Sequence, residues 1–306
     1  MLKKILYISL IVGGTAFLSG CADNSSGNSN SSSDELISAD SLSSDAPLKL
    51  SEEVISDVIQ NISSPVEMAS LIKSTGVSFS QKILNDPDNL DNYNTSFKRA
   101  LNLGVFAADL GYINTFDKNS IVVSYLLAVK NLADGIKVGQ FFDFAALKRL
   151  ASNSNNLDSL MEISVSSFNK MDAYLRAQNR SNVSSLIVAG TWIEGMYITG
   201  SVIEQTNNEE LINRLGEQKD IVNILLIILE NYKNDPNFTE LSTHLQGLKD
   251  LYSKVKITTE FSEPKKMEVD GSLIIVQDEI SHVEITPEQV TAIIDQIKKI
   301  RNYIVS

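Results

Sequence analysis

The segment DKNSIVVSYLLAVKNLADG, from Asp117 to Gly135, shows how most of this chain is built. Its apolar residues return every three or four positions, which is the spacing of one face of an α-helix. Asp117 stands where a helix cap is expected, and Gly135 stands where the helix should end. The segment therefore predicts an amphipathic helix. The apolar positions that carry the pattern are Ile121, Val122, Tyr125, Leu126 and Val129.

The same pattern extends in both directions from this segment. Short clusters of Asn, Ser, Asp, Gly and Pro separate apolar stretches of helical spacing, and few stretches alternate with the period of a strand. We predict an all-α fold over residues 47–258, an irregular bundle of roughly eight or nine helices. The expected helices start near Ser51 and Pro65 and then cover about 91–115, 117–135, 140–151, 156–177, 181–204, 208–233 and 238–256.

The C-terminal residues 259–306 follow a different pattern. Two β-prone runs flank Asp270-Gly271, a dipeptide typical of a tight hairpin turn. Thr286-Pro287 then starts a helix with an apolar stripe, and Lys298, Lys299 and Arg301 suit the negative end of its dipole. We expect a short hairpin that positions this terminal helix against the bundle. The alternative is an exposed amphipathic helix that docks on a partner.

Composition excludes several classes of protein. Cys21 is the single cysteine, so no disulfide scaffold can form, and with only two histidines a Cys- or His-rich zinc site cannot be assembled. The net charge of −12 argues against a nucleic-acid partner, which would require a basic patch. No phosphate-binding loop, nucleophile elbow or metalloprotease motif occurs, so we expect no cofactor and no metal.

The first 21 residues carry the most specific motif in the chain. Lys3 and Lys4 precede an apolar run from Ile5 to Phe17, which is too short for a membrane span and suits a secretory signal. The run ends in Leu18-Ser-Gly-Cys21, an apolar residue, two small residues and a cysteine. This pattern resembles the lipobox of bacterial lipoproteins, and the whole chain is similar to uncharacterised helical members of that class.

The resemblance implies a modification and a location. A signal peptide, residues 1–20, would be removed, and Cys21 would carry acyl chains that hold the protein on a lipid bilayer. Two or three chains anchor a protein stably, whereas one anchors it only marginally. Ala22, rather than aspartate, follows the cysteine, which implies a cell-envelope lipoprotein exported to the outer membrane. An ordinary signal peptide that ends near a cysteine by chance is the alternative.

Residues 21–46 are expected to act as a tether. After Cys21 the segment contains ten Ser and three Asn, scattered acids and no Lys or Arg. It has too little apolar surface to offset the entropy of ordering it. A flexible chain of this length has a root-mean-square reach of about 25–30 Å.

Two segments of the bundle resemble each other and form the candidate site. GVFAADLGYI, from Gly104 to Ile113, aligns with GTWIEGMYI, from Gly190 to Ile198, with one gap. Each has a glycine, an aromatic residue two positions later, an acid, and a tyrosine three positions after the acid. A duplicated half-bundle or chance could produce this similarity. Glycine inside a helix destabilises it by about 1 kcal/mol relative to alanine, so these glycines suggest close helix packing or access.

Two interpretations of these segments remain open. In the first, they face each other and line a polar pocket for a cation or an organic ligand. In the second, which we favour, each tyrosine hydroxyl satisfies its nearby acid, because an unpaired buried charge is costly. The pocket residues under the first interpretation are Asp109, Tyr112, Trp192, Glu194 and Tyr197.

Three functions are compatible with these observations. We prefer a membrane-anchored binding or assembly module with an unknown protein or small-molecule partner. A purely structural envelope protein is the second. The third, a carboxylate-based hydrolase, would require both acids close to a substrate pocket.

Overall fold

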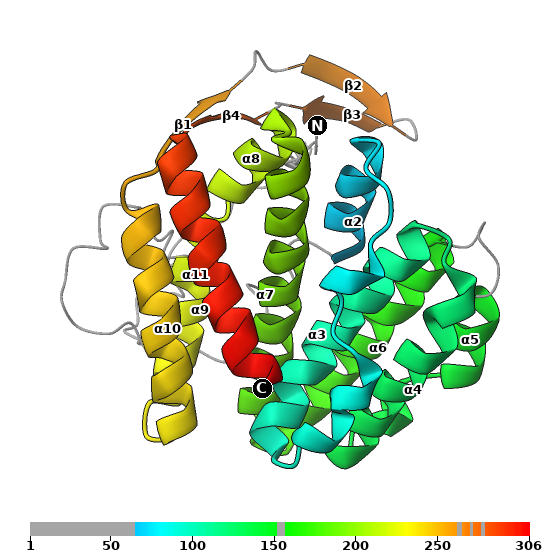
Figure 1. Ribbon diagram of the computed structural model, residues 1–306. Helices are drawn as coiled ribbons and strands as arrows, with labels where there is room; N and C mark the ends of the chain where they lie inside the picture. The colour runs from blue at the N-terminus through cyan, green and yellow to red at the C-terminus, as the bar shows by residue number, and fades with distance from the viewer. Residues whose placement is uncertain (1–64, 152–156, 262–264, 270–271, 277–278) are drawn as a thin grey trace, which may run out of the picture. The chain divides into compact units, whose positions relative to one another are not determined.

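The computed structural model describes residues 65–151, 157–261, 265–269, 272–276 and 279–306 (Figure 1). The predicted lipobox, tether and first helix lie outside these residues. The described chain is mostly helical with short strand pairs, which confirms the predicted all-α fold with a short hairpin. Its α-helices are α2 (Pro65–Ser74), α3 (Ser96–Thr115), α4 (Asn119–Gly135), α5 (Phe144–Ala151), α6 (Leu157–Ala177), α7 (Ser181–Thr206), α8 (Glu209–Gly216), α9 (Lys219–Glu230), α10 (Pro236–Tyr252) and α11 (Pro287–Val305).

The chain forms two compact units. One unit, Leu48–Thr258 with Ser281–Ser306, holds the helices. The other includes Thr259–Ile280, where β2 (Lys265–Val269) and β3 (Ser272–Val276) pair in antiparallel register, with Met267 opposite Ile274. Strands β1 (Lys256–Phe261) and β4 (Glu279–Glu284) also pair with each other.

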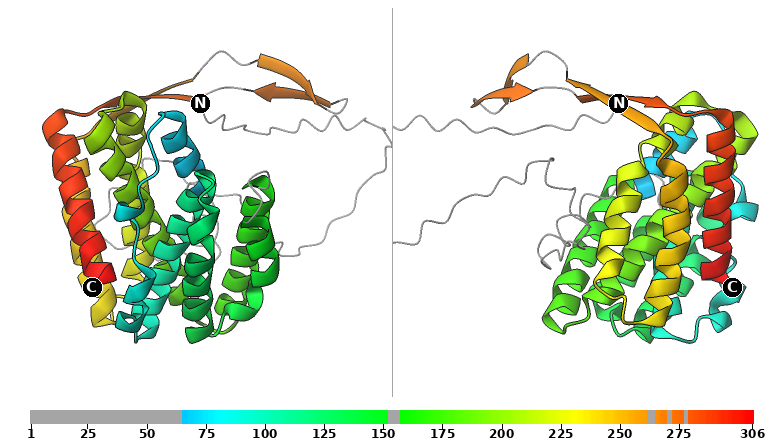
Figure 2. Two further views of the ribbon diagram at one scale, coloured as in Figure 1. Left: turned by 45° about the vertical axis from the view of Figure 1, so that its right-hand side comes forward. Right: turned by 90° about the vertical axis from the view of Figure 1, so that its left-hand side faces the viewer.

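Helix α7 is the centre of the helical unit. It packs most extensively on α3 and also contacts α2, α6 and α11, and the two views in Figure 2 show α11 lying along α7 and α10. By length and composition α7 is the one described helix that could cross a membrane. However, 83% of its most apolar window is buried inside the protein. Its apolar character is therefore that of a core helix.

The terminal helix α11 begins as its sequence indicates. The Thr286 hydroxyl accepts a hydrogen bond from the Gln289 backbone N–H, and the Gln289 side chain accepts one from the Thr286 N–H, so a complete capping box is formed. Its buried stripe contains Val290, Ile293, Ile294, Ile297, Ile300 and Ile304.

Several predicted helix boundaries were wrong. The helix expected from residue 91 starts at Ser96, because Thr95 caps it through the Lys98 backbone N–H. Asp117 does not cap α4: it has a φ of +57° and pairs with Lys73. The chain around residue 90 instead forms a short 3₁₀ helix, Pro87–Asn92.

The single helix expected over 208–233 is divided into α8 and α9. Helix α8 ends at Gly216, where a Cβ would lie 2.4 Å from Cγ1 of Val283. Buried Gln218 then separates the helices, because its side chain accepts a hydrogen bond from the Trp192 indole N–H (3.0 Å). Tertiary contacts, which short-range periodicity does not report, thus set this break.

Candidate functional site

The two similar segments pack directly against each other where α3 crosses α7. A Cβ on Gly104 would lie 2.1 Å from the carbonyl oxygen of Ile187, and a Cβ on Gly190 would lie 2.0 Å from that of Leu101. Both contacts are with backbone atoms, so a side chain at either glycine would push the helices apart. The crossing is symmetric: each glycine contacts the backbone of the residue that lies three positions before the other glycine. This crossing brings the two acids together, as the first interpretation of the sequence expected.

Asp109 of α3 and Glu194 of α7 form a fully buried acid pair. Both side chains are 0% exposed, and the two carboxyl groups interact directly. Oδ2 of Asp109 accepts a hydrogen bond from the backbone N–H of Asn85 (3.1 Å). Asn85 belongs to the segment between α2 and α3 that includes residues 76–93, which we call the strap.

Arg301 of α11 provides the cation for this pair. Its Nε and Nη2 donate to the two carboxylate oxygens of Glu194, at 3.1 and 3.3 Å. Its guanidinium also lies over the ring of Tyr197, 4.6 Å from the centroid. A two-pronged contact of this kind holds arginine and carboxylate in one orientation. The acid pair therefore joins three helices that are distant in the sequence.

The remaining predicted residues lie in other surroundings. The Tyr112 hydroxyl accepts a hydrogen bond from the Ser80 backbone N–H (3.2 Å), and its ring stacks on Phe79. Trp192 contacts Gln218 rather than the acids. Of the five predicted pocket residues, the structure gathers Asp109, Glu194 and Tyr197 around Arg301. The tyrosine hydroxyls do not satisfy the acids, because Asn85 and Arg301 take that role.

A second polar group fixes the end of α11. Nδ2 of Asn102 donates to the carbonyl of Ile304 (2.9 Å), and the Tyr93 hydroxyl donates to that of Val305 (3.3 Å). Asn85 contacts Tyr93 through its amide (3.0 Å), so the strap, the acid pair and the end of α11 share one hydrogen-bonded network. These contacts satisfy carbonyl groups that a helix leaves unpaired at its C-terminus.

Arg301 was not among the predicted site residues. This arginine was expected to complement the helix dipole, yet the residue is only 9% exposed. A signal was present, because Arg301 occupies the apolar stripe of α11, four positions after Ile297 and three before Ile304. A charged residue in such a stripe needs a buried partner. Asn85 had no comparable signal, since its backbone makes the contact.

Burial and charge shift the titration of these groups. Burial, together with the negative charge of Glu194, raises the pKa of Asp109 well above its usual value. Burial also raises the pKa of Glu194, although Arg301 opposes this effect. For Arg301, burial lowers the pKa, but the two acids outweigh it and the net pKa is raised.

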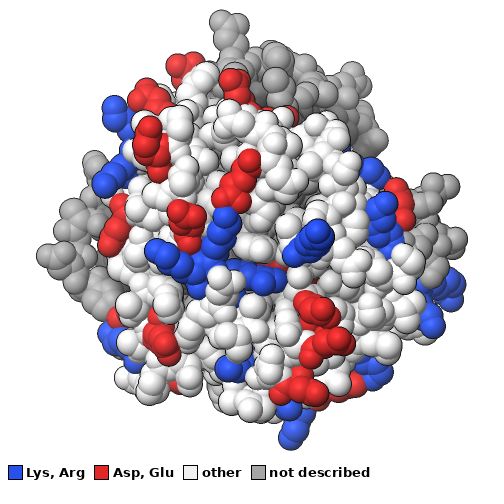
Figure 3. All heavy atoms as spheres, in the orientation of Figure 1, with Lys and Arg blue, Asp and Glu red and all other residues white. Residues whose placement is uncertain are grey.

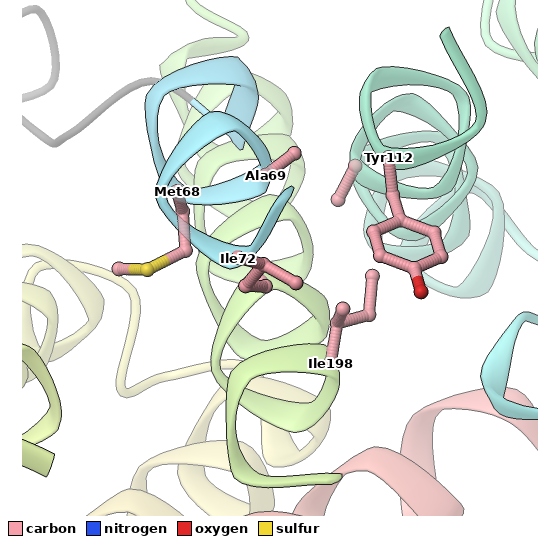
Figure 4. Close-up of a pocket in the computed structure, with 7 residues that line it drawn as sticks. Met68, Ala69, Ile72, Tyr112 and Ile198 are labelled. Carbon is pink, nitrogen blue, oxygen red and sulfur yellow. The ribbon is translucent and has the colours of Figure 1, made fainter. Parts of the chain in front are cut away.

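A small cavity lies between α2, α3 and α7, and neither Asp109 nor Glu194 lines it (Figure 4). Its volume is about 10 Å³, room for roughly one water molecule, whereas ligand pockets measure about 300–1,000 Å³. Figure 4 shows Ile72, Tyr112 and Ile198 extending toward one another from three helices. This cavity therefore offers no space for an organic ligand. It is lined by Met68, Ala69, Ile72, Ala108, Tyr112, Gly195 and Ile198.

The surface around α11 carries both signs of charge. Figure 3 shows basic side chains near the middle of this face with acidic side chains around them. One of the ion pairs joins Lys298 of α11 to Glu204 of α7. Within the described part of the chain, no three His, Cys, Asp or Glu side chains are grouped to hold a metal ion. Comparisons with protein families, with curated proteins and with solved structures found no match.

Proposed function

We propose that this protein is a lipid-anchored cell-envelope protein whose helical unit serves as a binding or assembly module. The observation that carries the proposal is the sequence Leu18-Ser-Gly-Cys21 after a basic and apolar leader. Acylation of Cys21 would place the protein on a bilayer, and the polar segment after it would leave the helical unit free to meet partners. Loss of Lys3 and Lys4 with the leader would change the net charge from −12 to −14.

The interior geometry supports a binding module over a hydrolase. Glu194 is held by Arg301 through both oxygens, and Asp109 is held by Asn85. Both acids are fully buried, and neither lines the small cavity between α2, α3 and α7, which holds only about 10 Å³. General acid and base groups must reach a bound substrate. We therefore assign the acid pair to holding the fold together.

Exposed apolar side chains support a binding surface over a purely structural role. Among the described residues, the large apolar side chains left exposed are Val123 and Leu127 of α4 and Val165 and Tyr174 of α6. Both helices pack on α5. Leu127 is the most exposed of the four at 60%. Val123 and Leu127 are four positions apart and so share one face of α4, and adjacent exposed apolar side chains commonly mark sites of protein association.

Fractionation tests the anchor. A Cys21→Ser variant and the unchanged chain are produced in the same bacterium, and membrane and soluble fractions are compared. We expect the unchanged chain in the membrane fraction and in the detergent phase of a phase separation. The variant should be absent from the membrane fraction and from the detergent phase, because its side chain cannot accept the lipid. Equal partitioning of the two would overturn the anchor.

Crosslinking tests the binding module. We expect photo-crosslinking from position 127 to yield a defined partner on intact cells, and Val123→Glu to abolish it. Asn302→Glu, an exposed change on α11, is the matched control and should retain the partner. The absence of any crosslink, with normal anchoring, would favour the purely structural role.

A further inference from the structure

The buried acid pair has more hydrogen-bond acceptors than donors. Oδ1 of Asp109 is buried, and no amide, hydroxyl or basic group in the described part of the chain donates to it. Its neighbour is the Glu194 carboxyl, which has no hydrogen to donate when it is bound to Arg301 as a carboxylate. A proton on Asp109 resolves this, because its O–H then donates to Glu194. Satisfied polar groups are the rule inside proteins.

Charge balance leads to the same protonation state. Two ionised carboxylates beside one guanidinium would leave a net negative charge in a fully buried site, whereas one shared proton makes the site neutral. The other titratable groups facing it are tyrosine hydroxyls: Tyr93 after the 3₁₀ helix, Tyr125 on α4 and Tyr197 on α7. Arg301 is the cation that acts on the pair.

We propose that Asp109 and Glu194 hold one proton between them and that this proton is a pH-sensitive latch on the strap and on α11. Asp109 holds the strap through Asn85, and Glu194 holds α11 through Arg301. When the proton is lost, the two adjacent carboxylates repel each other, and water enters to hydrate the second buried charge, which separates the strap and α11 from the acid pair. Both elements then loosen together, because Asn85, Tyr93 and the end of α11 belong to the same network.

The direction of the switch follows from the environment. Burial and the neighbouring negative charge raise the pKa of Asp109, so the closed state is favoured at low pH and weakens as the pH rises through the raised pKa. A rise in pH should therefore open the strap and the end of α11 before the rest of the helical unit unfolds. Local opening of this kind is detected by amide hydrogen exchange.

The test combines two measurements on the full mature chain. Carbon NMR of labelled carboxyl groups should show Asp109 remaining protonated well above about pH 3.8, the usual pKa of an aspartate. Hydrogen-exchange protection factors, which correct for the intrinsic effect of pH, should fall about tenfold or more for the strap and α11 as Asp109 ionises. Helix α10, which does not contain the acids, should change less.

Variants separate the latch from general stability. Asp109→Asn keeps the shape and donates an N–H to Glu194, so protection of the strap and α11 should lose its pH dependence. Asp117→Asn, which removes an exposed acid paired with Lys73, should keep it. If Asp109→Asn does not fold, the NMR titration of the unchanged chain still tests whether Asp109 keeps its proton. Ionisation of both acids below pH 5, or protection independent of pH, would overturn the proposal.

Discussion

Glu194 of α7 accepts two hydrogen bonds from Arg301 of α11, which lies 107 positions later in the chain, and this ion pair is enclosed by the protein. The contact joins the last described helix to the central one. Breaking a buried pair by removing one partner is strongly destabilising, because the other charge is left without compensation. The ion pair between Glu194 and Arg301 therefore makes the stability of the fold depend on the docking of α11.

Arg301→Met tests this dependence. The change keeps a long apolar side chain but leaves Glu194 without its cation, so we expect a loss of about 3 kcal/mol in the free energy of unfolding. Denaturant unfolding measures it. Lys298→Met on the same helix removes only a partly exposed contact with Glu204 and should change stability by less than about 1 kcal/mol. Similar losses for both variants would contradict the role assigned to Arg301.

Alanine at Gly104 or Gly190 tests the helix crossing. Each new Cβ would lie about 2 Å from a carbonyl oxygen of the opposite helix, so the helices must separate. Because the clash is with backbone, we expect a loss of about 3 kcal/mol or more, or failure to fold. Thermal unfolding of each variant provides the measurement. Surface substitutions usually change stability by less than about 0.5 kcal/mol. A change this small in either glycine variant would show that the crossing is looser than described.

Gly195 is the contrasting glycine of the same helix. A Cβ there meets nothing within 4 Å, and the residue lines the small cavity beside Tyr112. Alanine removes the penalty of glycine inside a helix, so Gly195→Ala should stabilise the protein by about 1 kcal/mol. The midpoint of denaturant unfolding should rise. A lower midpoint would show that access to the cavity matters more than helix propensity.

The pH dependence of global stability follows from the raised pKa values of Asp109 and Glu194. Their usual values are 3.8 and 4.5, so above this range the unfolded chain has released both protons, whereas the folded acid pair still retains one. The unfolded state is then favoured increasingly, and stability falls as the pH rises toward the folded-state pKa. Unfolding free energies measured from pH 4 to pH 8 should show this decline. Asp109→Asn should flatten it, and a rise in stability over this range would contradict the assignment.

Local sequence patterns predicted most helices but not all their boundaries. The period of the apolar residues located α6 and α7, and the Thr286 cap located the start of α11, because those signals depend on neighbouring residues. The break between α8 and α9 depends on Gln218 contacting Trp192 and on Val283 packing over Gly216. Such contacts join residues far apart in the sequence, so a short window does not report them. Strand β4, which pairs with β1, was missed for the same reason.

The candidate site was also predicted in part. The repeated glycines and acids correctly indicated two facing segments, since small residues permit a close crossing. The partner of Glu194 could not be predicted from that pattern, because it depends on how α11 docks. Helical spacing alone predicted that Tyr112 would contact Asp109. In the structure, the Tyr112 hydroxyl instead accepts a hydrogen bond from the backbone N–H of Ser80 in the strap.

The intact mass of the protein extracted from bacterial membranes tests the proposed anchor most directly. We expect a polypeptide that begins at Cys21 and carries additional mass from acyl chains on that residue. A free thiol at Cys21, or a chain that retains residues 1–20, would contradict the lipid anchor and the cell-envelope function built on it.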